Sequence, residues 1–244
     1  MFSIRSRGKF LDVLQSVCIS GDYTVSLQNI HLRKLLKIMY LEGAARISAL
    51  RSDIREDIAR EDGPSEGGGD FYGPFWRDAK DHVFGVTDLR DQTRIRIESN
   101  GGRTALYRRL RDGFLLWWDE RRRWTNEPFR PANAMKTVCR VVGVDADIKV
   151  ANILAVRDGN DEDHFVYPYW FPEPALNDES ARLGLWLLCQ AFPNVERAEF
   201  RILDVIRGQT YRLERNPLQG TEGATFQRRF ATALAQWQAL RLEY

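Results

Sequence analysis

The fold class is most visible in residues 146–171, which read ADIKVANILAVRDGNDEDHFVYPYWF. Through the first twelve positions apolar residues alternate with polar ones, with one slip, as in a strand that buries one face. The polar run 158–163 predicts a turn, and 164–171 predicts a second strand. We therefore expect a β-hairpin, whose second strand is at an edge or bulged because Pro168 lacks the N–H that a sheet would use.

Helical patterns precede this hairpin. Apolar residues recur every three or four positions through 26–62, with Gly43 as a break between two helices. Two further helices, rich in aromatic residues and arginine, are predicted over 71–85 and from 104 to about 125. A strand begins near Met135, with one face formed by Val138, Arg140, Val142 and Val144.

After the hairpin the helical period returns. Asn177 or Asp178 caps a helix that ends before Pro193, two strands surround the turn Gly208-Gln209, and the last helix runs over 221–243. This order predicts an α/β (α+β) fold with a small mixed sheet flanked by helices. We expect a helical extension at 1–62, a Gly-rich linker or loop at 63–70, and a mixed α/β core at 71–244.

Composition excludes several classes of protein. The 244 residues are 43% hydrophobic, which excludes a disordered chain, and no apolar run is long enough to span a membrane. The first residues show no signal-peptide core, and the three cysteines form neither a disulfide framework nor a zinc pattern. We therefore expect a cytoplasmic protein with no membrane partner. Its three histidines lie far apart in sequence, which argues against a zinc site.

The order of elements from about residue 75 to the end resembles the restriction-endonuclease-like core of the PD-(D/E)xK nucleases, in particular the RecB- and Cas4-type exonuclease domains. Residues 144–159 resemble the Asp-bearing strand, with Asp147 in the place of the catalytic Asp. Residues 181–193 resemble the motif helix, and 200–214 resemble the strand pair that follows.

The resemblance implies Mg²⁺ held by two carboxylates, with a lysine close by. In the second strand, Tyr167 and Tyr169 stand where the acid and the lysine are expected. Arg182 and Trp186 replace the Gln and Tyr of the motif helix. This register therefore implies a degenerate, inactive relative, a pseudo-nuclease for which no cofactor is expected.

A second register would keep activity. Strand alternation places Asp145, Asp147 and Lys149 on one face, and Glu127 could supply the partner carboxylate. An active enzyme of this kind would use Glu127, Asp147 and Lys149, with Mg²⁺ on Glu127 and Asp147. The alternative is a solvated strand face whose charges form cross-strand ion pairs.

The stretch 103–130 is rich in arginine and carries three tryptophans. Arginines bind phosphates and rings stack on unpaired bases, so this mixture suits DNA or RNA. We expect the residues that bind nucleic acid to be Arg121, Arg122, Arg123, Trp124, Arg130 and Tyr169. The alternative is an amphipathic helix with its tryptophans in the core and its arginines solvated.

Three functions follow from these patterns. The first is a nucleic-acid-associated protein with a nuclease-like but inactive core, serving as a subunit of a DNA-processing or phage-defence assembly. The second is an active Mg²⁺-dependent nuclease. The third is an interaction subunit that binds no nucleic acid, in which 26–62 and the proline-punctuated run 167–174 contact a protein partner or a second copy of the chain.

Overall fold

The computed structural model describes residues 14–16, 27–61, 71–141 and 146–244. The linker predicted at 63–70 lies outside these residues, as do Val142, Val144 and Asp145. The fold is mixed α/β, as predicted, and contains two mixed sheets. No helix among the described residues is long and apolar enough to cross a membrane.

The first sheet has the strand order β1-β4-β5-β2, in which only the β2–β5 pair is parallel. Its strands are β1 Leu14–Ser16, β2 Asn29–His31, β4 Thr137–Val141 and β5 Ala146–Val150. In β4 the buried residues are Cys139 and Val141, so the face predicted from Val138 and Arg140 is the less buried one.

The second sheet has the order β3-β6-β7-β8-β9, in which only the β7–β8 pair is parallel. Its strands are β3 Arg130–Pro131, β6 Leu154–Arg157, β7 Asp163–Tyr169, β8 Phe200–Asp204 and β9 Gln209–Tyr211. The parallel pair is connected through a helix, as parallel neighbours require.

The predicted hairpin is confirmed as β6 and β7, but its first strand is shorter than expected. Residues 146–150 form β5 in the other sheet, and the chain turns at Asn152, whose φ is +67°. Trp76 Nε1 donates to the Asn152 carbonyl at 2.6 Å, and Lys80 Nζ donates to that of Ile153 at 2.9 Å. The single slip in the alternation therefore marks a passage between two sheets.

Strand β7 lies between β6 and β8 for most of its length, so the predicted edge or bulge can apply only near Pro168. The last pair with β6 joins Leu154 to Val166, and Pro168 lies beyond it. At Pro168 only β8 is paired with β7, with Leu203 as the partner residue. The proline is tolerated because the strand is locally at an edge there.

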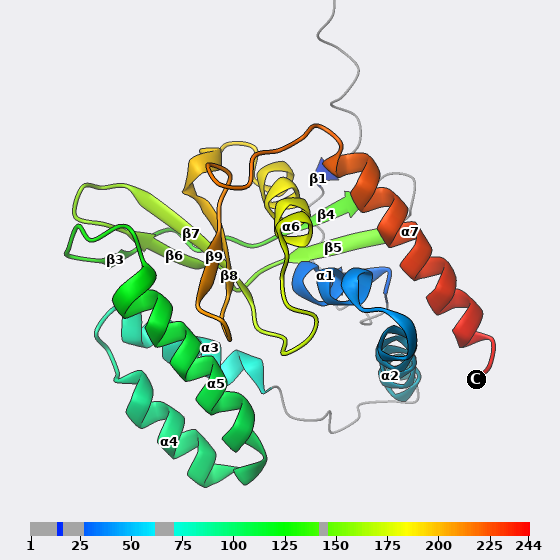
Figure 1. Cartoon of the computed structure of the whole chain (residues 1–244), viewed down its shortest axis with the longest axis horizontal. Helices are drawn as coiled ribbons and strands as arrows, with labels where there is room; N and C mark the ends of the chain where they lie inside the picture. Colours follow the sequence, from blue (N-terminus) through cyan, green and yellow to red (C-terminus); the bar gives the residue numbers. More distant parts are fainter. Residues whose placement is uncertain (1–13, 17–26, 62–70, 142–145) are drawn as a thin grey trace, which may run out of the picture.

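Helices pack on both faces of the second sheet and on one face of the first (Figure 1). They are α1 Leu32–Tyr40, α2 Gly43–Glu61, α3 Tyr72–Val83, α4 Leu89–Ser99, α5 Thr104–Leu115, the π-helix η2 Leu116–Arg121, α6 Asp178–Ala191 and α7 Glu222–Arg241. Short 3-10 turns occur at η1 Gly101–Arg103 and η3 Arg197–Glu199. Asn177 caps α6 as predicted, whereas α4 was not predicted, and the long helix after Thr104 ends at Arg121 instead of near Thr125.

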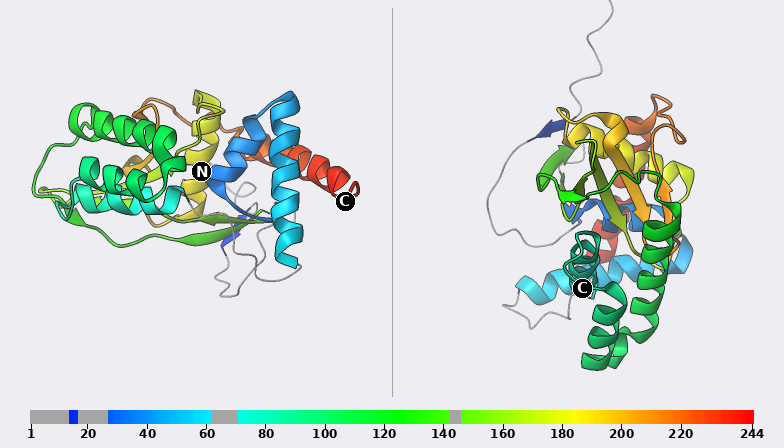
Figure 2. Two further views of the ribbon diagram at one scale, coloured as in Figure 1. Left: turned by 90° about the horizontal axis from the view of Figure 1, so that it is seen from below. Right: turned by 90° about the vertical axis from the view of Figure 1, so that its left-hand side faces the viewer.

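Two hydrophobic clusters hold the molecule together. One gathers apolar residues of β2, α1, β5, α6 and α7, and it includes Leu27, Ile30 and Leu35. The other joins α3, α5 and η2 to β6, β7 and β8 through rings such as Phe114 and Trp117. Figure 2 shows α3, α4 and α5 at one end, with α1, α2 and α7 at the other. The two helices predicted within 26–62 are present as α1 and α2, and α1 packs into the main core with α6 and α7.

Candidate anion-binding site

A pocket of about 290 Å³ lies between η2 and β9, which is the last strand of its sheet. Six arginines and one acidic residue, Glu120, line it, together with Trp117, Trp124 and the residues Gly208–Thr210. We call it the arginine pocket, and its arginines are Arg121, Arg122, Arg123, Arg201, Arg212 and Arg215. They come from three directions: the end of η2, strand β8 and the turn that follows β9.

Few carboxylates neutralise these arginines. The Arg212 guanidinium lies 3.2 Å from Glu214, and Arg201 donates to the Glu199 carbonyl at 2.9 Å. Among the described residues, the side chains of Arg123 and Arg215 have no hydrogen-bond or ion-pair partner. The pocket therefore carries a positive potential that suits an anion.

Arg122 is supported by aromatic rings. Its guanidinium lies 3.9 Å from the centroid of the Trp118 ring, 4.2 Å from that of Phe129 and 5.2 Å from that of Trp124. Its Nε and Nη1 are buried and have no hydrogen-bond partner. Burial lowers the pKa of Arg122, against the opposite effect of two acidic neighbours, Glu127 and Asp119. The rings fix the orientation of the cation without neutralising it.

Two glycines let η2 approach the turn between β8 and β9. A Cβ added to Gly113 would lie 2.2 Å from the Val205 carbonyl oxygen, and one added to Gly208 would lie 2.6 Å from the Gly113 carbonyl oxygen. Gly208 also has a φ of +57°, which favours glycine. This close contact places the last turn of η2, and the arginines that follow it, beside β9.

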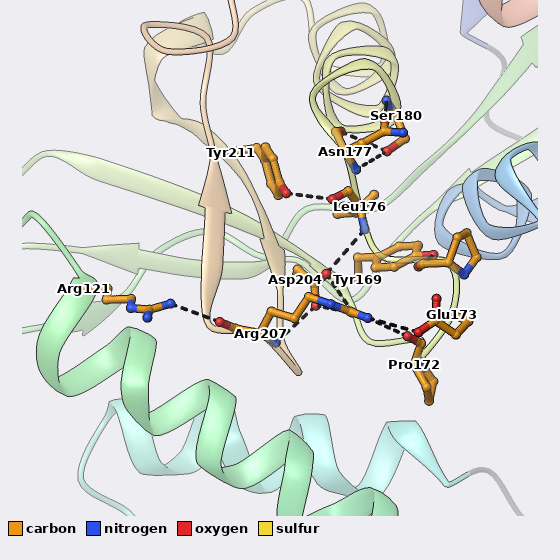
Figure 3. A network of polar contacts seen from close by, with 11 residues as sticks. Arg121, Tyr169, Pro172, Glu173, Leu176, Asn177, Ser180, Asp204, Arg207 and Tyr211 are labelled. Carbon is orange, nitrogen blue, oxygen red and sulfur yellow. Dashed lines mark hydrogen bonds and ion pairs between the residues drawn. The ribbon is translucent and has the colours of Figure 1, made fainter.

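A polar network holds the same turn from the other side (Figure 3). Arg121 Nη1 donates to the carbonyls of Arg207 and Gly208, at 3.1 and 3.3 Å. The Arg207 guanidinium lies 3.1 Å from the Asp204 carboxylate and donates to the Pro172 carbonyl at 2.6 Å. Asp204 is fully buried, and burial raises its pKa against the opposite effect of Arg207.

The two aromatic residues predicted to stack on bases are both buried, which corrects that prediction. Trp124 is 7% exposed and packs against His164, and Tyr169 is 1% exposed. The Tyr169 hydroxyl donates to the Pro174 carbonyl at 2.7 Å. Trp124 belongs to the cluster that includes Phe114 and Trp117, and Tyr169, which lies on β7, belongs to the cluster that includes Leu27 and Ile30.

The predicted arginines separate into two groups. Arg121, Arg122 and Arg123 line the arginine pocket. Arg130 lies on β3 outside it, where its guanidinium forms an exposed ion pair with Asp161 at 2.8 Å. Exposed pairs of this kind contribute little to stability.

The three candidate nuclease residues do not come together. Asp147 and Lys149 share a face of β5, as predicted, and Arg140 Nη1 lies 3.2 Å from the Asp147 carboxylate. Glu127 precedes β3 beside the hairpin turn, where Gly159 N donates to the Asn126 carbonyl. Figure 1 shows β3 and that turn at one end of the molecule, away from β5. Glu127 and Asp147 thus do not fit a shared Mg²⁺ site.

The hairpin turn contains another group of possible metal ligands. Ligand atoms of Asp158, Glu162 and His164 lie within 4.8 Å of one another. The Asp158 carboxylate already accepts from the backbone N–H groups of Asn160 and Glu162, and from His164 Nε2 at 3.2 Å. Burial acts to raise the pKa of Asp158, but these hydrogen bonds lower it overall. Asp158 therefore organises the turn.

Sequence reasoning did not find Arg201, Arg212 and Arg215. Each is a single arginine in a strand or turn, with no local cluster to single it out. One signal for them was present in the sequence, the strand pair predicted around Gly208-Gln209. The arginines of that pair must face a neighbouring element, but the sequence does not show which one. Only the packing of η2 against β9 shows that this element is the end of the arginine-rich helix.

Comparisons with protein-family models, with curated proteins and with solved structures gave no match.

Proposed function

We propose that this protein binds DNA or RNA without cleaving it, and that the arginine pocket binds phosphate groups of that nucleic acid. The observation that carries the proposal is the convergence of six arginines and one acidic residue on a single pocket. Guanidinium groups bind phosphate oxygens in a planar, two-pronged geometry, and phosphate contacts supply much of the affinity for nucleic acid.

The positions of the candidate catalytic residues support the non-catalytic part of the proposal. Metal-dependent phosphodiester hydrolysis needs carboxylates that share a cation. Glu127 and Asp147 belong to different regions of the fold, and Asp147 is paired with Arg140. A nuclease-like core without such a pair would keep a surface for nucleic acid and lose hydrolysis.

The test is fluorescence anisotropy with labelled single-stranded DNA, duplex DNA and single-stranded RNA at two salt concentrations, with Mg²⁺ present. The double variant Arg123→Ala/Arg215→Ala removes the two arginines that have no side-chain partner among the described residues. We expect it to bind about tenfold or more weakly, because two phosphate contacts are lost. The dependence of log K on log salt should become shallower by about one to two units.

The matched control is Arg108→Ala/Arg109→Ala, which removes the same charge from exposed positions on α5 outside the pocket. It should keep most of the affinity. An equal loss in both variants would indicate a general charge effect and overturn the assignment to the pocket. Cleavage of the labelled strands that is abolished by Asp147→Ala would overturn the non-catalytic part.

A further inference from the structure

Among the described residues that line the arginine pocket, no exposed ring is available for a base to stack on. Its two aromatic lining residues, Trp117 and Trp124, are 1% and 7% exposed, and Trp118 beside them is 8% exposed. Arg122 lies over the rings of Trp118 and Trp124. Single-stranded nucleic acid is normally bound by exposed aromatic rings together with a basic groove. The charged groups that remain in this pocket are mostly guanidinium groups, which suit phosphate.

The charge of the pocket exceeds that of one backbone phosphate. Six guanidinium groups and one carboxylate surround about 290 Å³, which is near the lower limit for small-molecule sites. A phosphodiester carries one negative charge, whereas a phosphate monoester carries about 1.5 to 2 near neutral pH. A small space with several cations therefore matches a group that concentrates several negative charges.

The arginines also surround the pocket. Arg121, Arg122 and Arg123 lie at the end of η2, Arg201 enters from β8, and Arg212 and Arg215 lie in the turn beyond β9. A continuous strand of nucleic acid is usually followed by cations along a groove. Cations on three sides of a compact pocket instead suit a nucleic acid strand that ends inside the pocket.

We infer that the arginine pocket binds a terminal phosphate group, a monophosphate or polyphosphate at the end of a nucleic acid strand. This inference rests on the proposed function and names the part of the nucleic acid that the pocket selects. A monoester has one more non-bridging oxygen than a diester, so it can accept from an additional guanidinium. Selection depends on the end and not on the bases.

The test compares oligonucleotides of one sequence that differ only at their ends. The set holds a 5′-hydroxyl, a 5′-monophosphate, a 5′-triphosphate and a 3′-phosphate form, together with a covalently closed circle of the same sequence. We expect the best phosphorylated end to bind about tenfold or more tightly than the hydroxyl form and the circle. Inorganic triphosphate should compete with it. In Arg123→Ala/Arg215→Ala the preference for the phosphorylated end should disappear, while in Arg108→Ala/Arg109→Ala it should remain.

The outcomes separate this inference from the proposed function. Equal affinity for the circle and for every linear form would overturn the inference and leave nucleic-acid binding intact. Binding of ATP and inorganic triphosphate without binding of any oligonucleotide would overturn the proposed function and assign the pocket to free nucleotides. Binding of neither class would overturn both.

Discussion

The indole of Trp124 stacks on the imidazole of His164, with ring centroids 4.2 Å apart and planes inclined by 12°. This contact joins the segment after η2 to strand β7. It fixes Trp124, which directly follows the three adjacent pocket arginines 121–123 in the sequence. His164 is itself 4% exposed, and its Nε2 lies 3.2 Å from the buried Asp158 carboxylate. The end of the arginine-rich segment is therefore attached to the hairpin through a titratable ring.

Stability should depend on pH through His164. Burial lowers its pKa below the ordinary value of 6.5, although Asp158 acts in the opposite direction. The unfolded chain then takes up the proton at a higher pH than the folded protein does, so protons favour unfolding below about pH 6.5. We expect the free energy of unfolding in urea to fall between pH 7.5 and pH 5.5. His164→Gln should reduce this slope. An unchanged slope in His164→Gln would show that other groups cause it.

Arg122→Lys should weaken binding of nucleic acid although it preserves the charge. A lysine cannot cover the Trp118 and Phe129 rings with a planar cation, so the charge would lose the orientation that these rings give to the guanidinium. We expect a loss of about 1 kcal/mol in binding free energy, measured by anisotropy. Arg123→Lys is the comparison, since Arg123 is exposed and stacks on no ring in the structure. A similar effect in both variants would mean that the rings add nothing specific.

Removal of Arg207 should cost more stability than neutralisation of Asp204. In Arg207→Ala the fully buried Asp204 carboxylate loses its cation, and broken pairs of this kind cost about 3 kcal/mol or more. Asp204→Asn keeps the shape and removes the charge, so we expect a loss of about 1 kcal/mol. Urea unfolding of both variants and of the double variant gives the coupling. The double variant should lose less free energy of unfolding than the sum of the two single losses. Losses that simply add would contradict the pairing of Arg207 with Asp204.

Gly113→Ala should both destabilise the protein and weaken the binding of nucleic acid at the arginine pocket. The new Cβ would meet the carbonyl oxygens of Val205 and Ile206 at 2.2 and 2.3 Å, and both are backbone atoms. We expect a loss of about 2 kcal/mol in the free energy of unfolding and a lower affinity for nucleic acid. Gly101→Ala is the control because its Cβ would meet nothing within 4 Å. Normal stability of Gly113→Ala would show that η2 can move away from the turn.

The local sequence was sufficient to predict the hairpin and helix α6. The hairpin follows from alternation and a polar turn, and α6 follows from a cap at Asn177 or Asp178 and from Pro193 after its end. The structure selects Asn177 and adds a capping box with Ser180. Helix α4 was missed because its apolar pattern is weak, since only Leu89 and Thr93 are buried along it. Its cap is local, because the Asp88 carboxylate accepts from the backbone N–H groups of Arg90 and Asp91. The sequence predicts residues 146–157 as one strand because the alternation continues across Asn152 with a single slip.

The site could be predicted only in part. Three adjacent arginines after a helix are visible in sequence, but whether Trp124 is a base platform or a core residue depends on which strand covers it. The hairpin supplies that cover through His164. Arg201 and Arg215 join the pocket through long-range packing, which no local pattern encodes.

The junction at Asn152 has a mechanical consequence. Only three residues separate β5 from β6, and α3 holds two of their carbonyl groups through Trp76 and Lys80. We therefore expect the hairpin to have little freedom to turn relative to the first sheet. The hairpin also carries His164, which stacks on Trp124 beside the pocket arginines, so one wall of the pocket is anchored to the same short junction.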